Sequence, residues 1–555
     1  MKVLRISSRK SDLARIQAYE VAREIRRLLP QTRLEFSFRE SLGDQNQNDP
    51  LWKMPEKGVF TSDFKEDLIE GKTDIVVHSW KDLPIEAQEK TKIVATLKRA
   101  DPRDLLLLKK NFRINNSIPK LRIFTSSPRR EFCLNKNFHK LFPLLAEPPE
   151  IEFVAVRGNI LTRLKKFSND SEIQGIFVAK AAIDRILGAP GWVDSNSTPN
   201  LDSFDGPKTE IADLLSRFDL RILPLEWFPT AAAQGALALE IASGRSDLTW
   251  FLSKINSSPD FDCVQTERKI LSDLGGGCHE KVGITVEIKA GTKRFFFVSE
   301  KKHPDFLENP IRYEFSPNSR ILEIVKSASV NEMWPTPRGD NFKESLPDIV
   351  ERVPLNSMSI LESYRKFKTE FKIVPEALLW IPAHPTTLGL CAQIKELFAE
   401  MTLGLVWAPG EKTFVECLKR GLRPLGHSSS SGIQSEDWNG ILKLTGAQKI
   451  IHLSHGDSQN LNFLNLPVYQ LRSKPREEIF AQLQGKKIFF WKSPTKFKFA
   501  QESGFDFTKS EYFHFCGAGK TYEYLKDRIP LDRLELLPGG ESQWTDLTKQ
   551  LRNPL

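Results

Sequence analysis

The chain has 555 residues, which is too many for a single hydrophobic core, so three or four domains are expected. Hydrophobic residues make up 40% of it and charged residues 27%, an ordinary composition for a soluble protein. No apolar run approaches the eighteen residues of a membrane-spanning helix, so no membrane association is expected. The N-terminus becomes charged at once and lacks the apolar core of an export signal, which predicts a cytoplasmic protein.

The net charge of +9 and the six cysteines narrow the possible partners. The cysteines form no C-x-x-C pair, so we expect neither a metal site nor a disulfide framework. A positive net charge suits either a nucleic acid or an acidic small molecule. Because no run of lysine and arginine is interleaved with aromatic residues, we favour the acidic small molecule and expect no nucleic-acid partner.

Short strands alternate with helices over the first 240 residues, which is typical of α/β sheets. Ser11 is positioned to cap the first helix. Residues 223–240 read as a return crossing, so we expect two α/β lobes with a cleft between them. The expected strands are 3–6, 34–38, 74–79, 122–124, 154–156 and 175–179, and the expected helices include 13–28, 60–69 and 160–167.

Cationic side chains gather at the ends of these expected strands, where α/β sheets bind their ligands. Asp82 is the one acid among them, and we expect it to exchange a proton with the cationic or N–H part of a ligand. Converging cations would repel one another without an anion, so the pattern predicts a ligand with several carboxylates or phosphates. The cations are Arg9, Lys81, Arg129, Arg130, Arg157 and Arg163, and the neighbouring hydroxyls are Ser11, Thr125, Ser126 and Ser127.

Further along the chain, a helical pattern runs into Leu274, and three glycines at 275–277 then end it. Cys278 follows on the loop. It is either a small residue in a tight turn or a thiol to which something is attached. The C-terminus of a helix disfavours a thiolate, so a functional Cys278 needs a partner that brings its own reactivity.

Eight segments of this half, in order, resemble the hydroxymethylbilane synthase family, also called porphobilinogen deaminase. The segments are RISSRKSDLA at 5–14, KGVF at 57–60, VHSWKDLP at 77–84, DPRD at 101–104, TSSPRR at 125–130, VRGN at 156–159, QGA at 234–236 and GGC at 276–278.

The resemblance implies two periplasmic-binding-protein-like lobes and a small α+β domain. It implies that Cys278 carries a covalent dipyrromethane cofactor and that Asp82 is catalytic, as four porphobilinogens are joined into hydroxymethylbilane. The residues that the resemblance assigns to the carboxylates of cofactor and substrate are Arg9, Ser11, Lys57, Ser79, Lys81, Thr125, Ser126, Ser127, Arg129, Arg130, Arg157, Arg163 and Gln234.

Over the last 230 residues, expected strands alternate with helices in two similar halves. This pattern resembles uroporphyrinogen-III synthase, a two-lobed α/β enzyme. The segments that carry the resemblance are the expected strands at 377–381, 404–408, 487–491 and 512–516 and a central region at 449–453 and 466–469. That resemblance implies that hydroxymethylbilane is cyclised, with inversion of ring D, to uroporphyrinogen III. The site residues that it implies are Tyr469, Ser493 and Thr521.

Together the two resemblances predict a bifunctional, monomeric enzyme of tetrapyrrole biosynthesis. Two alternatives stay open: a deaminase whose C-terminal half is a non-catalytic scaffold or partner-binding region, and a two-lobed solute-binding module without chemistry. The predicted division is lobe 1 at 1–103 and 220–245, lobe 2 at 104–219, a cofactor-attachment domain at 246–325, and the synthase-like region at 326–555.

Overall fold

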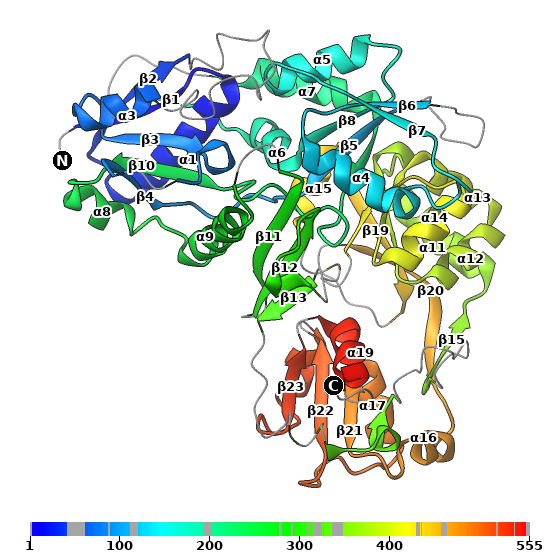
Figure 1. The fold of residues 1–555 in the computed structure, drawn as a ribbon. Coiled ribbons are helices and arrows are strands. Elements are labelled where there is room, and N and C mark those ends of the chain that lie inside the picture. The colour runs from blue at the N-terminus through cyan, green and yellow to red at the C-terminus, as the bar shows by residue number, and fades with distance from the viewer. Residues whose placement is uncertain are drawn as a thin grey trace.

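The computed structural model arranges the chain in five sheets with helices packed around them (Figure 1). The residues that it describes are 3–40, 62–86, 89–110, 120–192, 203–276, 280–289, 292–307, 311–314, 323, 325, 327–335, 348–428, 433, 436–456, 463–517, 520–537 and 539–550.

The first sheet has the strand order β2-β1-β3-β10-β4. Its first three strands run parallel, and β10 runs antiparallel to both β3 and β4. The helix that follows β1 begins after Ser11, whose Oγ accepts a hydrogen bond from the Ala14 N–H, so the predicted N-cap is confirmed. The elements are β1 (Val3–Arg9), α1 (Asp12–Leu28), β2 (Arg33–Arg39), α3 (Ser62–Ile69), β3 (Ile75–Ser79), η2 (Trp80–Asp82), β4 (Thr91–Ala95) and β10 (Leu237–Ala242).

The second sheet repeats this pattern with the order β7-β6-β8-β5-β9. Here β6, β7 and β8 are parallel, and β5 runs antiparallel to β8 and β9. Its elements are β5 (Asp104–Lys109), β6 (Lys120–Phe124), α4 (Pro128–Leu141), β7 (Glu150–Val154), α5 (Ile160–Asn169), β8 (Gly175–Ala179), α6 (Lys180–Gly188), α7 (Asp205–Ser216) and β9 (Phe218–Ile222).

The strand predicted at 154–156 is wrong in its position. The paired residues end at Val154, which lies opposite Phe124. Beyond that point the Val156 N–H bonds to the Ser126 side chain rather than to a neighbouring strand. A short apolar run cannot indicate which of its residues pair, because the partner strand sets the register.

Two crossings connect these sheets: the first crossing, residues 96–103, and the second crossing, residues 223–236. They touch where the Ala100 N–H donates to the Gly235 carbonyl over 3.2 Å. Gly235 has φ of +88°, and a Cβ there would lie 2.5 Å from the Ala100 oxygen. Only glycine therefore allows this contact.

A three-stranded antiparallel sheet, β11-β12-β13, follows, with α9 packed on β11. It is tied to the crossings by the buried Glu267, which bonds Arg99 over 2.6 and 3.0 Å and the Ala233 and Val286 N–H groups over 2.7 Å each. After α9, φ is +102° at Gly275 and +61° at Gly276, as the glycine stop predicted. The elements are α8 (Ser246–Leu252), α9 (Ser258–Asp273), β11 (Val282–Lys289), β12 (Thr292–Ser299), η3 (Pro304–Phe306) and β13 (Ile311–Glu314).

The C-terminal half contains two sheets, each with its own helices (Figure 1). The larger has the order β15-β20-β19-β16-β17-β18, in which the strands from β20 to β18 run parallel and β15 runs antiparallel to β20. The smaller, β14-β21-β22-β23, is entirely parallel. The strands predicted for this half are confirmed.

The larger sheet has β15 (Val350–Pro354), α11 (Ser357–Glu370), η5 (Pro375–Ala377), β16 (Leu378–Pro382), α12 (Pro385–Gln393), α13 (Lys395–Leu403), β17 (Leu405–Ala408), α14 (Glu411–Lys419), β18 (Pro424–His427), α15 (Trp438–Thr445), β19 (Lys449–His455) and β20 (Leu464–Ser473). The smaller has η4 (Val330–Glu332), β14 (Met333–Trp334), α16 (Arg476–Leu483), β21 (Ile488–Trp491), α17 (Pro494–Glu502), β22 (Phe513–Gly517), α18 (Lys520–Leu525), β23 (Leu534–Leu537) and α19 (Gly540–Gln550).

Across the described ranges, no helix combines the length and the hydropathy needed to cross a bilayer. The same ranges hold no group of three or more His, Cys, Asp or Glu residues placed to bind a metal ion.

We expect Gly235→Ala to destabilise the protein by at least about 2 kcal/mol, because an L-residue pays for positive φ and its Cβ meets the first crossing. Calorimetry should show the loss as a lower midpoint of the first unfolding transition. Gly188→Ala is the matched control, since a Cβ there meets nothing within 4 Å. Equal midpoints for the two variants would contradict the close approach of the crossings.

Candidate functional site

The predicted cations of both lobes meet at the strand ends of the first two sheets. Arg9 ends β1, Lys81 lies in η2, and α4 carries Arg129 and Arg130. Arg157 lies between β7 and α5, and Arg163 lies on α5. Burial and the charges of Arg130, Arg157 and Arg9 together lower the pKa of Arg163 to about 10, while Asp82 opposes this shift. The sequence-predicted groups are therefore close enough to act on one another. We call Arg9, Lys81, Asp82, Arg129, Arg130, Arg157 and Arg163 the first cluster.

Asp104, at the start of β5, organises the second-lobe side of this cluster. Its two oxygens accept from Arg129 Nη2 over 2.8 Å and from Arg130 Nη2 over 2.7 Å. Its side chain is fully buried. Burial raises the pKa of the Asp104 carboxyl, but the two guanidinium groups outweigh burial and hold that pKa below its usual range.

Gln234, on the second crossing, links the two lobes through Asp104. Its Nε2 donates to Asp104 Oδ1 over 2.9 Å and to the Pro102 carbonyl over 2.6 Å. Its Oε1 accepts from Lys81 Nζ over 3.2 Å. The lysine of the first lobe is thereby connected to the arginine pair of the second.

Asp104 was missed as a site residue in the sequence. It lies in the DPRD segment, but a single acid before an apolar strand carries no sign of its partners. Its partners, Arg129 and Arg130, are 25 and 26 residues away. An acid that follows a crossing and precedes two adjacent arginines is the available signal, and it is weak.

Several predicted hydroxyls hold the backbone of the site. Ser126 Oγ bonds both the N–H and the carbonyl of Val156 over 3.2 Å, and Thr125 Oγ1 accepts from the Ser127 N–H over 3.2 Å. Ser127 occupies the N-cap position of α4. Their contact with a ligand stays a prediction, as does that of Ser79 at the end of β3.

Two predicted residues, Lys57 and Cys278, lie outside the described residues. Arg163 is described, and its Nε donates to the Gly158 carbonyl over 2.7 Å. That bond orients its guanidinium group along the start of α5, next to Arg130 and Arg157.

The first cluster fits a polycarboxylate cofactor such as a dipyrromethane. With Asp104 included, it brings six cations against two acids. Arg130 Nε is buried without a hydrogen-bond partner among the described residues, as is Arg129 Nε. Carboxylates match such guanidinium edges in charge and geometry.

A second cluster lies on the larger C-terminal sheet, and we define it as Arg352, His384, Lys412, His455 and Tyr469. Arg352 and Tyr469 lie within β15 and β20, whereas the other three lie at or just beyond the ends of β16, β17 and β19. Burial lowers the pKa of His384, with help from the charges of Arg352 and Lys412. Burial raises the pKa of Tyr469, and a hydrogen bond with Arg352 opposes this rise. The rings of His455 and Tyr469 are 6.0 Å apart.

The smaller sheet contributes to the same region. Burial, with the charges of His455 and Lys520, lowers the pKa of His452 on β19 to about 4. Lys520 begins α18, which follows β22, so a charge from the smaller sheet acts on a residue of the larger sheet. Thr521 follows Lys520, whereas Ser493 caps α17 by accepting from the Lys496 N–H over 3.3 Å.

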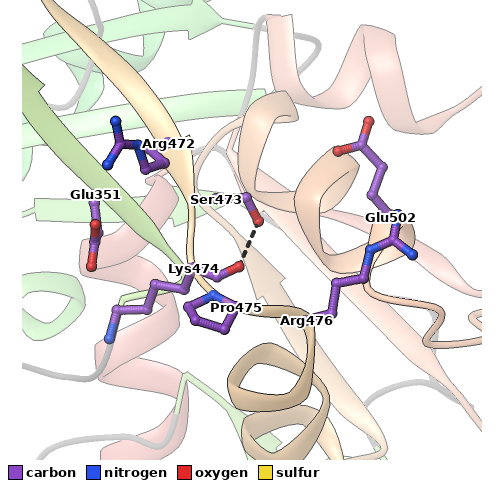
Figure 2. A pocket seen from close by; sticks show the side chains of 7 residues that line it. All are labelled: Glu351, Arg472, Ser473, Lys474, Pro475, Arg476 and Glu502. Atoms are coloured by element: carbon purple, nitrogen blue, oxygen red, sulfur yellow. Dashed lines mark hydrogen bonds between the residues drawn. The ribbon is translucent and has the colours of Figure 1, made fainter.

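A separate hollow of about 640 Å³ lies beside the strands that connect the two C-terminal sheets (Figure 2). Its charged residues are of both signs, unlike those of the second cluster. Glu351 lines it, so Arg352, the next residue on β15, points to the opposite face of the strand. The lining residues are Glu351, Arg472, Ser473, Lys474, Pro475, Arg476 and Glu502.

The fold and the first cluster define a two-lobed α/β protein whose lobes bring a group of cations together. The model of the family described as porphobilinogen deaminase, dipyromethane cofactor binding domain, matches residues 4–249. The chain is 33% identical to a porphobilinogen deaminase of Syntrophomonas wolfei over 52% of this chain and 83% of that protein. It is 34% identical to one of Caldicellulosiruptor saccharolyticus over 51% of this chain and 84% of that protein.

The chain therefore belongs to the porphobilinogen deaminase family, and its N-terminal part is the domain that binds the dipyrromethane cofactor. These two relatives cover about half of the chain. Among solved structures, the periplasmic sulphonate binding protein SsuA of Escherichia coli matches 50% of this chain and 71% of that chain at 11% identity, with a TM-score of 0.24.

Lys81 provides a direct test of the first cluster. Burial lowers its pKa to about 8, with Arg130 and Arg129 adding to the shift and Asp82 and Asp104 opposing it. Carbon-13 NMR of the dimethylated protein should show one lysine titrating near pH 8, against about 10.4 for a free lysine. Its signal should vanish in Lys81→Arg and move to higher pH when a carboxylate ligand binds. A midpoint near the free value would refute this placement.

Proposed function

We propose that residues 1–325 join porphobilinogen units into hydroxymethylbilane on a dipyrromethane that is covalently attached to Cys278. The observation that carries the proposal is the approach of Arg9 and Asp82 of one lobe to the arginines of the other. A growing chain of pyrroles bears two carboxylates per ring, and the first cluster offers the matching excess of positive charge.

The proposed roles follow from the position of each side chain. The dipyrromethane, when bound, supplies the pyrrole carbon to which units are added. Arg130, Arg157 and Arg163 pair with carboxylates, while Lys81 brings a proton-dependent charge between Gln234 and Asp82. The exposed carboxylate of Asp82 holds pyrrole N–H groups and moves a proton to the amino nitrogen as ammonia leaves.

Attachment at Cys278 is tested by the mass of the intact protein. We expect the purified wild-type chain to exceed its sequence mass by two pyrrole units, and Cys278→Ala to lack the excess. The buried Cys133 provides a control, because Cys133→Ala should keep the added mass. An unmodified wild-type mass in substrate-replete protein would remove Cys278 from the mechanism.

The role of Asp82 is tested by turnover. Asp82→Ala should keep its melting temperature but lose turnover by at least about 10²-fold, as expected for loss of a general acid–base.

We also propose that the C-terminal half cyclises hydroxymethylbilane to uroporphyrinogen III. The second cluster supports this proposal because it gathers cations and histidines on one sheet, with Lys520 of the other sheet nearby. A linear tetrapyrrole with eight carboxylates suits such a cluster. In the proposed reaction Tyr469, bonded to Arg352, assists loss of the terminal hydroxyl. Ser493, the N-cap of α17, and Thr521, in the first turn of α18, would bind carboxylates.

The alternative is a deaminase whose C-terminal half is a non-catalytic scaffold or partner-binding region. The isomer of the product distinguishes the two. Cyclisation by the protein gives the type III isomer, whereas spontaneous closure gives type I.

We expect the full chain to convert porphobilinogen mainly to the type III isomer. Arg352→Leu and Tyr469→Phe should lower the type III fraction while ammonia release continues at the wild-type rate. Chromatography of the oxidised porphyrins measures the fraction. Arg365→Leu is the control, because Arg365 pairs with Glu396 on the surface of the same half. Type I alone from the wild-type chain would eliminate the cyclisation proposal and leave the deaminase untouched.

A further inference from the structure

The C-terminal half packs against the second lobe of the deaminase as part of one core. Trp407 is fully buried, and Ile441 and Leu444 of α15 share a hydrophobic cluster with Ile211 and Ile183 of α7 and α6. Figure 1 shows α15 beside α6. These contacts resemble a domain interior rather than a tethered domain.

Two strands from different sheets also approach closely at this interface. β18 lies along β9, and Arg221 donates to the Pro424 carbonyl. A Cβ on Gly426 would lie 3.0 Å from the Ile222 oxygen and 3.1 Å from the Trp407 ring. The two backbones therefore approach over a glycine, which leaves the two bodies little freedom to slide.

Arg103 is where this interface reaches the active site. It ends the first crossing, and the next residue, Asp104, holds Arg129 and Arg130. The Arg103 carbonyl accepts from the Lys180 N–H over 3.0 Å. Its guanidinium group binds both oxygens of Asp101, with Nη2 2.7 Å from Oδ2.

Glu436, from the C-terminal half, is a second carboxylate that pairs with Arg103. Its Oε2 lies 2.8 Å from Arg103 Nη2, and its side chain is only 5% exposed. Glu436 also bonds Ser428, which in turn accepts from Trp407 Nε1 over 2.7 Å. Burial raises the pKa of Glu436, and Arg103 is the charge that most opposes this rise.

A buried carboxylate without a partner is costly, so Glu436 and Arg103 hold each other in place. Arg103 already has Asp101 as a counter-ion, so Glu436 is not needed to neutralise it. What Glu436 adds is a fixed direction: it ties the guanidinium group to the interface formed by Trp407 and Ser428.

We propose that Glu436 is a positioning residue of the deaminase reaction, because it fixes the first crossing through Arg103 and thereby aligns Asp104 with the cations of the first cluster. The C-terminal half is then a working part of the deaminase, whether or not it cyclises the product. The proposal rests on the deaminase activity and is independent of the cyclisation proposal.

The test compares three variants of the full, cofactor-loaded chain. Glu436→Met keeps the volume and removes the acceptor, whereas Glu436→Gln keeps an acceptor without the charge. Glu396→Met is the matched control, since Glu396 pairs with Arg365 on the surface of the same half. Each variant is measured for intact mass, for kcat and KM of ammonia release, and for amide hydrogen exchange of residues 96–104.

We expect Glu436→Met to keep the cofactor mass and a KM within threefold of the wild type, because the carboxylate-binding groups remain. Its kcat should fall at least tenfold, with faster exchange in the first crossing. Glu436→Gln should recover kcat to within threefold, and Glu396→Met should match the wild type.

Four results would overturn the proposal. They are a kcat of Glu436→Met within threefold of the wild type, a raised KM with unchanged kcat, an equal loss in Glu436→Gln, and a Glu436→Met protein that does not fold, which would make the residue structural.

Discussion

The pairing of Asp104 with Arg129 and Arg130 is the interaction on which the N-terminal half depends. One buried carboxylate holds two adjacent guanidinium groups and a glutamine that reaches Lys81 in the other lobe. Removing one partner from such a buried set typically costs about 3–5 kcal/mol, because the remaining charges are left uncompensated. The same carboxylate therefore stabilises the second lobe and orients Arg129 and Arg130 of the first cluster.

The cations around this pair outnumber the acids and determine the chemical character of the first cluster. Burial lowers the pKa of Lys81 and of Arg163, which shows that the protein holds these charges in an environment that disfavours them. In the proposed function, an anionic ligand relieves that cost on binding, and this relief favours a substrate with many carboxylates. Asp82, exposed at the end of η2, is then the acid closest to the reacting nitrogen in the proposed mechanism.

The C-terminal half applies the same principle with other residues. Arg352 lies within β15, His384 and Lys412 follow the ends of β16 and β17, and Lys520 follows β22 of the smaller sheet. Its larger sheet is also joined to the deaminase through a buried glutamate–arginine pair. The two halves thus share a core and a charged contact.

Much of the fold could be predicted from the sequence, because strands and helices follow from patterns of near neighbours. The Ser11 cap, the glycine stop after α9 and the strands of the C-terminal half are confirmed, whereas the strand at 154–156 is misplaced because β6 sets its register. The cations near the strand ends could likewise be identified from the sequence. The domain boundaries and the ligand contacts of the site residues stay predictions.

Only the tertiary structure decided which charges pair. Arg129 and Arg130 looked like two free clamps, yet both bind Asp104. Arg103 meets Glu436 across 333 residues of chain. No local pattern encodes such a contact, because it depends on how complete lobes pack against each other. The sequence alone determined the family and the chemical character of the cleft, and packing determined which of its charges are already paired within the protein.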